Sequence, residues 1–134
     1  MQSRTELQHS EITEAIIGCA FQVSNELGTG FLESVYEKSL AMLLREKGLS
    51  CSSQHPIQVK FRGVVVGEFV ADLLVEGKVV VKLKAVKGIA PEHQAQVINY
   101  LKATEMDVGL LINFGCPRLE FKRFTRASKS ENPD

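Results

Sequence analysis

The first part of the chain has the hydrophobic periodicity of two amphipathic helices. Apolar residues recur every three or four positions from Ile12 to Leu27, and Ser10 stands before them as a possible N-cap. A second stripe of the same kind predicts a helix over residues 32–47. Gly48 follows at the C′ position, where glycine is the preferred residue.

After the second helix the pattern changes to alternation. Residues 57–61 alternate apolar and polar side chains, which is typical of a strand. Two further strands are predicted over residues 64–75 and 79–86. The turns between these strands are too short for crossover connections, so we expect an antiparallel meander.

The last part of the chain predicts a helix followed by a buried strand. The helix covers residues 91–104, with Pro91 at its first position. Residues 108–112 form a continuous apolar run, which is typical of a buried strand. The helical connection is long enough for a right-handed parallel crossover. One more edge element is expected around residues 119–124, which completes an α/β fold with a mixed sheet flanked by helices.

Length and composition predict a single domain with a packed core. The chain has 134 residues, of which 44% are hydrophobic, so we expect a single domain over residues 1–126 and a flexible polar tail over residues 127–134. No apolar run could cross a membrane, and the N-terminus lacks the features of a secretory signal. Cys19, Cys51 and Cys116 form no CxxC pair, so we expect a cytoplasmic protein without zinc or disulfides.

Charge is balanced in total but uneven along the chain. The formal net charge is zero, with −3 in residues 1–57 and +3 in residues 58–134. A local excess of basic residues near the C-terminus provides candidates for phosphate contacts: Arg118, Lys122, Arg123 and Arg126. A solvated surface explains the same residues equally well.

Three charged residues fall in the predicted central strands. Asp72 lies on the second strand, and Lys82 and Lys84 share a face of the third. A tight hairpin would bring Asp72 close to both lysines, and charged groups at such positions need partners or a purpose. Alternation also places Glu68 on the face of Asp72. An ion-pair network at a sheet edge is the structural alternative.

The helices contribute further polar candidates. Glu33 lies in the first turn of the second helix, where the helix dipole favours a carboxylate. Tyr36 lies on the same face and is more typical of a core position. His93, Gln96 and Tyr100 form a stripe on the third helix, which an ordinary amphipathic helix explains as well.

The chain resembles the GxxExxY protein family. The signature residues are Gly30, Glu33 and Tyr36, and the resemblance continues through ADLLVEGKVVVKLKAV, PEHQAQVINYLKAT and VGLLINFG. It covers the chain from about Ile12 to Phe124. That family is placed in the PD-(D/E)XK nuclease-like superfamily, so the resemblance implies a restriction-endonuclease-like fold.

The resemblance also implies a site for metal-dependent hydrolysis of DNA or RNA. Asp72 and Glu33 match residues that hold Mg²⁺ or Mn²⁺, through the oxygen ligands that such ions prefer. Lys84 matches the lysine that orients the attacking water or stabilises charge on the phosphate. Gln96 matches a helix glutamine that positions the attacking side.

The chain departs from this pattern at Lys82, where the family normally has an acid. The change removes a ligand and places a cation beside the expected metal. Two unit charges 4 Å apart interact by about 4 kcal/mol at an effective dielectric of about 20, so the lysine should oppose metal binding. Lys82 would instead pair with Asp72 or Glu33.

Three functional hypotheses follow. In the first, the chain is a degenerate nuclease that serves as a nucleic-acid-binding or protein-interaction module. In the second, it is an active nuclease in which Glu68 or Glu33 supplies the missing oxygen ligand. In the third, it is a partner-binding subunit without nucleic-acid contact. A homodimer or a protein partner is compatible with all three, and no membrane partner is expected.

Overall fold

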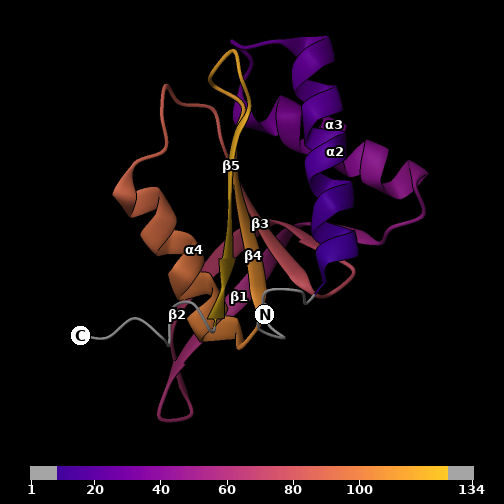
Figure 1. Cartoon of the computed structure of the whole chain (residues 1–134). Coiled ribbons are helices and arrows are strands. Elements are labelled where there is room, and N and C mark those ends of the chain that lie inside the picture. Colours follow the sequence, from indigo (N-terminus) through magenta and orange to yellow (C-terminus); the bar gives the residue numbers. More distant parts are fainter. Residues whose placement is uncertain (1–8, 127–134) are drawn as a thin grey trace, which may run out of the picture.

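A computed structural model describes residues 9–126, and the predicted tail over residues 127–134 lies outside this range. Five strands form one sheet in the order β1-β2-β3-β4-β5. Helix α4 covers one face of the sheet, and α2 and α3 cover the other (Figure 1). The elements in chain order are α2 (Ser10–Leu27), α3 (Glu33–Glu46), β1 (Cys51–Phe61), β2 (Val64–Val75), β3 (Val79–Lys84), α4 (Pro91–Thr104), β4 (Val108–Asn113) and β5 (Glu120–Thr125).

The strand pairing confirms the predicted fold class. Strands β1, β2 and β3 form the expected antiparallel meander. Strand β4 pairs with β3 in parallel, so the connection through α4 is a crossover. Strand β5 pairs antiparallel with β4 and forms the far edge of the sheet. Within residues 9–126, none of the helices has the length and apolar character that a membrane span requires.

Some predicted element boundaries were wrong. Strand β1 begins at Cys51 rather than Ile57, because its first half is a largely exposed edge strand that needs no apolar alternation. Strand β3 ends at Lys84 rather than at residue 86. The N-cap of α2 is His9 in the left-handed conformation, and Ser10 is the first helical residue. The hydroxyl of Thr13 donates to the Ser10 carbonyl, which begins the first turn.

Tyr36 belongs to the main core, as its apolar surroundings in the sequence indicated. Its side chain is fully buried between the sheet and α2, and its ring stacks on Phe114 at 4.7 Å between centroids. The hydroxyl donates to the Gly28 carbonyl oxygen at 2.6 Å and accepts from the Phe31 N–H at 3.3 Å. Tyr36 therefore holds the turn that leads into α3 and sets the position of that helix over the sheet.

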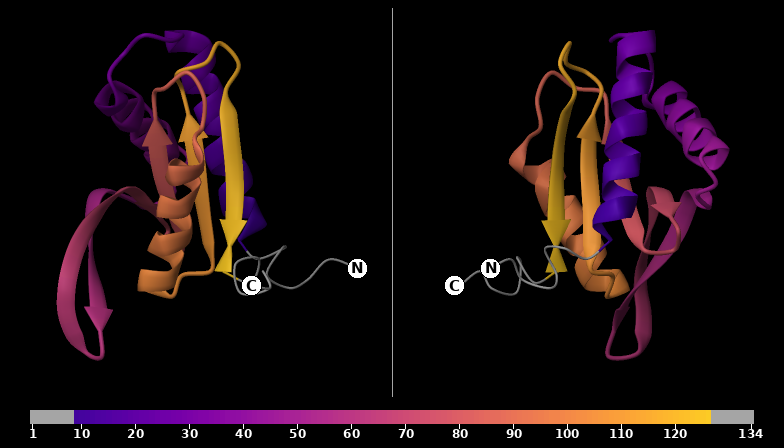
Figure 2. Two further views of the ribbon diagram at one scale, coloured as in Figure 1. Left: turned by 90° about the vertical axis from the view of Figure 1, so that its left-hand side faces the viewer. Right: turned by 45° about the vertical axis from the view of Figure 1, so that its right-hand side comes forward.

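The hairpin of β1 and β2 extends beyond the body of the molecule. Figure 2 shows it leaving the sheet in both views. The β2–β3 ladder contains only the pairs from Leu73↔Val81 to Val75↔Val79, while the β1–β2 ladder continues to Phe61↔Val64. The sheet therefore forks immediately before Leu73. This fork is where the charged residues of the two strands meet.

Candidate functional site

Asp72 lies at the fork between β2 and β3. It directly precedes the first β2 residue paired with β3, and its Oδ2 accepts the Leu83 N–H at 2.7 Å. The carboxylate thus takes the place of a main-chain acceptor where the ladder ends. This bond fixes Asp72 in position and satisfies a buried backbone donor, which would otherwise be costly.

Lys82 forms an ion pair with Asp72, as the tight hairpin predicted. Its Nζ lies 3.7 Å from Asp72 Oδ2, and the two side chains are only 17% and 15% exposed. Tyr100 of α4 lies within electrostatic range of this pair. Burial raises the pKa of Tyr100, and the neighbouring Lys82 ammonium opposes that rise. Lys82 is therefore held between the fork and α4.

Glu33 connects the start of α3 to the end of β3. Its Oε2 lies 3.9 Å from Lys84 Nζ and accepts the Ala85 N–H at 3.2 Å. Its side chain is 45% exposed, so this ion pair is more accessible to solvent than the pair between Lys82 and Asp72. The fold brings Glu33, Asp72, Lys82 and Lys84 to one region of the sheet, and each carboxylate is paired with one ammonium.

Glu37 and Gln54 also belong to this site and were missed from the sequence. Gln54 Nε2 donates to Glu37 Oε1 at 2.6 Å and to Asp72 Oδ1 at 3.5 Å. Glu37 follows Glu33 by four residues, so helical spacing could have found it. Gln54 carries no such signal, because its position depends on a left-handed backbone conformation (φ 51°) within β1.

Glu37→Gln is expected to stabilise the protein at neutral pH. Burial raises the pKa of Glu37, and the Asp72 charge adds to this effect, against the Gln54 hydrogen bond. The contribution of Glu37 to stability is therefore complete below its ordinary pKa of 4.5 and is lost as the pH rises through the folded-state pKa. Gln keeps the acceptor without the charge. We therefore expect the free energy of unfolding at pH 7 to rise by about 0.5 kcal/mol, a value that already includes the reduction by solvent screening.

Urea unfolding near pH 4 and pH 7 measures this effect. The gain should be present at the higher pH and absent at the lower, where the carboxyl is protonated in both states. Glu46→Gln, at an exposed position on α3, is the matched control and should show a smaller difference between the two pH values. An equal gain at both pH values would show that charge is not its cause.

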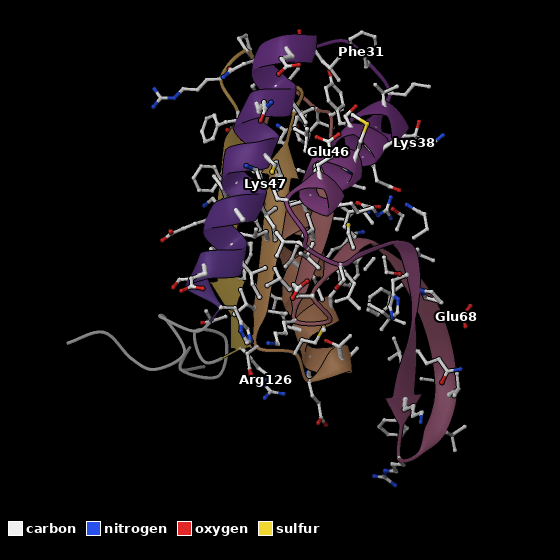
Figure 3. The ribbon with its side chains drawn as sticks, turned by 90° about the vertical axis from the view of Figure 1, so that its right-hand side faces the viewer. Phe31, Lys38, Glu46, Lys47, Glu68 and Arg126 are labelled. Carbon is white, nitrogen blue, oxygen red and sulfur yellow. The ribbon has the colours of Figure 1, made fainter. Side chains whose placement is uncertain are left out.

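Three other predicted residues lie outside the fork. Glu68 lies on the projecting hairpin, where its side chain points away from the body of the molecule (Figure 3) at the rim of a groove beside α4, so its predicted place beside Asp72 was wrong. The reason is that β2 turns over near Asp72: Ala71 packs on the α4 side, whereas Leu73 packs on the α2 and α3 side. Gln96 lines a groove between the hairpin and α4. His93 caps α4 by accepting the Ala90 N–H at Nδ1.

The basic residues near the C-terminus do not form one patch. Phe121 contacts Phe21 of α2, so alternation along β5 places Arg123 on the α2 side and Lys122 on the opposite side. Arg126 Nη2 lies 3.0 Å from Asp107 Oδ1. Arg118 and Lys122 line a shallow hollow of about 410 Å³ near Phe21. A phosphate backbone would therefore meet Arg118 and Lys122 together at this hollow, but Arg123 and Arg126 at other places.

The fork does not fit a divalent metal ion in this arrangement. Mg²⁺ and Mn²⁺ are held by oxygen ligands, with carboxylates as the main charged donors. Asp72 and Glu33 are each occupied by an ammonium group and by a backbone N–H. In the described residues, no three His, Cys, Asp or Glu side chains converge as potential metal ligands. Lys82 thus contributes a positive charge where the fold would otherwise need a cation.

The forked mixed sheet, with an acid at the fork and helices on both faces, defines an α/β protein of the restriction-endonuclease-like type. A family model described as the PD-(D/E)XK nuclease superfamily matches residues 10–124. The chain therefore belongs to the PD-(D/E)XK nuclease superfamily.

Comparison with solved structures supports the same fold. The crystal structure of SSO0001 matches with a TM-score of 0.53 and 18% sequence identity, over 91% of this chain and 62% of that one. The present chain thus spans less than two thirds of that structure. A search of curated proteins gave no match.

Proposed function

We propose that this chain is a GxxExxY-type member of its superfamily that binds nucleic acid without cleaving it. The observation that carries the proposal is the ion pair between Lys82 and Asp72, with 3.7 Å between Nζ and Oδ2. Gly30, Glu33 and Tyr36 have the spacing of the family signature. The contacts of these residues give that spacing a structural reason, since Tyr36 holds the turn before α3 and Glu33 joins the start of α3 to the segment after β3.

The electrostatics of the fork favour a site that works without metal. An ammonium already neutralises Asp72, and a second ammonium neutralises Glu33. A divalent ion would have to displace Lys82 from a largely buried position and then remain close to its charge. This repulsion supports loss of metal-dependent catalysis, with Lys82 as the structural replacement for the ion.

Nucleic acid is the partner that superfamily membership favours. The polar groove beside α4 supplies lysine and amide side chains, which suit phosphates and bases. The three cysteines are free thiols, which is compatible with the reducing cytoplasm that we propose as its location.

Retained hydrolysis is the second candidate, and Glu37 favours it. Gln54 contacts both Glu37 and Asp72, so Glu37 is a nearer source of an additional carboxylate than Glu68. In this alternative, Glu33 and Asp72 hold Mg²⁺ or Mn²⁺, and Lys84 and Gln96 are the catalytic residues. It requires Lys82 to leave Asp72 in the presence of metal.

The test combines metal titration with nucleic-acid binding. We expect calorimetry to detect no Mg²⁺ or Mn²⁺ binding at millimolar concentrations. Labelled oligonucleotides should bind in the presence of EDTA, with affinity that falls as salt rises, because bound phosphates release counterions. Incubation with either metal should leave plasmid and single-stranded substrates uncut.

Two results would contradict the proposal. Metal binding that disappears in Asp72→Asn, together with cleavage, would establish the second candidate. Absence of oligonucleotide binding even at low salt would indicate instead a subunit that contacts only a protein partner. Asp72→Asn is the suitable variant because it keeps an acceptor for the Leu83 N–H.

A further inference from the structure

A long groove separates the projecting hairpin from α4. Its volume is about 1210 Å³, and its lining includes Gln58 and Lys60 of β1 together with Asn99 and Lys102 of α4. Phe69 and Tyr100 also line it, with their rings stacked at 4.1 Å between centroids. The stack joins the two walls and gives the groove an aromatic base.

The walls of the groove have the chemistry to bind a strand with phosphates and bases. Lys60 and Lys102 come from opposite walls, and both are exposed. Neither forms an ion pair with another residue of the described range. The side-chain amides of Gln58 and Asn99 can donate to and accept from base edges. Glu68 and Glu105 also line the groove, so its net charge is small and recognition cannot rest on charge alone.

The tip of the hairpin continues this surface. Phe61 is 62% exposed, and the Arg62 guanidinium carbon lies 5.2 Å from its ring centroid. Such an aromatic and arginine pair offers a stacking surface and a phosphate contact together. Both residues directly follow Lys60 of the groove along the chain.

The chemistry of this face favours a single strand over a duplex, because the exposed ring of Phe61 offers a stacking surface that suits unpaired bases. We infer that the groove between the hairpin and α4 binds single-stranded nucleic acid, with Lys60 and Lys102 on its phosphates. This inference rests on the proposed function, and it names the surface that binds the nucleic acid.

Fluorescence anisotropy with labelled oligonucleotides of about 12 nucleotides tests the inference, since single-strand sites commonly cover about 4–16 nucleotides. The probes are one DNA and one RNA strand and the matching duplex, without metal. Lys60→Ala/Lys102→Ala should weaken single-strand binding about tenfold. The slope of the logarithm of affinity against the logarithm of salt concentration should also fall in magnitude by about 1.4, because each lost phosphate contact with a single strand removes about 0.7.

Lys38→Ala/Lys47→Ala is the matched control. It removes the same charge from two exposed positions on and directly after α3, on the opposite face of the sheet from α4, and it should leave both the affinity and the slope near their original values. Circular dichroism verifies that both double variants are folded.

The outcomes separate this inference from the proposed function. If the wild type binds oligonucleotides but the Lys60→Ala/Lys102→Ala variant binds equally well, the groove is not the binding surface and the proposed function stands. Tighter binding of the duplex than of either strand would also overturn the inference. If no probe binds to the wild type, both are wrong. In that case, concentration-dependent dimers in sedimentation would indicate that the exposed hairpin contacts a second copy of the chain.

Discussion

Asp72→Ala is expected to lower the free energy of unfolding by about 3 kcal/mol. The change leaves the Leu83 N–H without its acceptor and the Lys82 ammonium without its counterion, at side chains that are only 15% and 17% exposed. Loss of one partner from a buried hydrogen bond costs about 1–3 kcal/mol, and loss of one partner from a buried ion pair costs about 3–5 kcal/mol. The two losses share one carboxylate and so are not additive, and partial exposure reduces both, which gives an expected loss at the low end of the larger range. Urea unfolding at pH 7 measures it.

Two further variants identify the cause of this loss. Asp72→Asn keeps the acceptor without the charge, so it should lose about half as much stability. Lys82→Met in the Asp72→Ala background should recover part of the loss, because it removes the uncompensated charge. A loss below about 1 kcal/mol in Asp72→Ala would mean that water replaces both contacts and that the fork is not held by this carboxylate.

Lys82→Glu is expected to create a metal-binding site and to make stability depend on metal. Without metal the new carboxylate faces Asp72, and the like charges should destabilise the protein. With metal, the oxygens of Glu33, Glu37 and Asp72 would be joined by the new carboxylate. If its Kd for Mg²⁺ is about 1 mM, about 10 mM Mg²⁺ should stabilise the variant by about 1.4 kcal/mol.

Thermal unfolding with and without Mg²⁺ measures this difference, and calorimetry gives the affinity directly. Lys82→Met is the matched control, because it removes the ammonium without adding a ligand. We expect a clear response in Lys82→Glu, little in Lys82→Met and none in the wild type. A Lys82→Glu variant that folds but does not respond to Mg²⁺ would show that the acids at the fork do not converge on a common ion.

Hydrophobic periodicity was sufficient to predict most elements of this fold. Helix α4 runs from Pro91 to Thr104 as predicted, because a proline at the start and a continuous stripe define it locally. The first half of β1 was missed for the opposite reason. Residues from Ser52 to Pro56 are polar or lack a backbone donor, and they become a strand only by pairing with β2.

The candidate site was predictable where strand pairing alone brought its members together. Asp72 and Lys82 could be placed together from a tight hairpin alone, and Glu33 was indicated by the resemblance to the GxxExxY family. Gln54 could not be predicted from the sequence, because its left-handed backbone conformation within β1 turns the side chain toward Glu37 and Asp72. The basic residues of β5 were grouped by sequence distance, whereas alternation across a strand separates Lys122 from Arg123.

The sequence by itself determined the order of the elements, the mixed sheet and the presence of a lysine where the superfamily has an acid. These features depend on local periodicity, short turns and residue identity, which can be read along the chain. Only the tertiary structure decided that β2 forks from β3 at Asp72, that Lys82 pairs with Asp72 rather than with Glu33, and that Glu37 and Gln54 complete the cluster. These contacts depend on twist and on the packing of α3 over the fork, which join residues far apart in the chain.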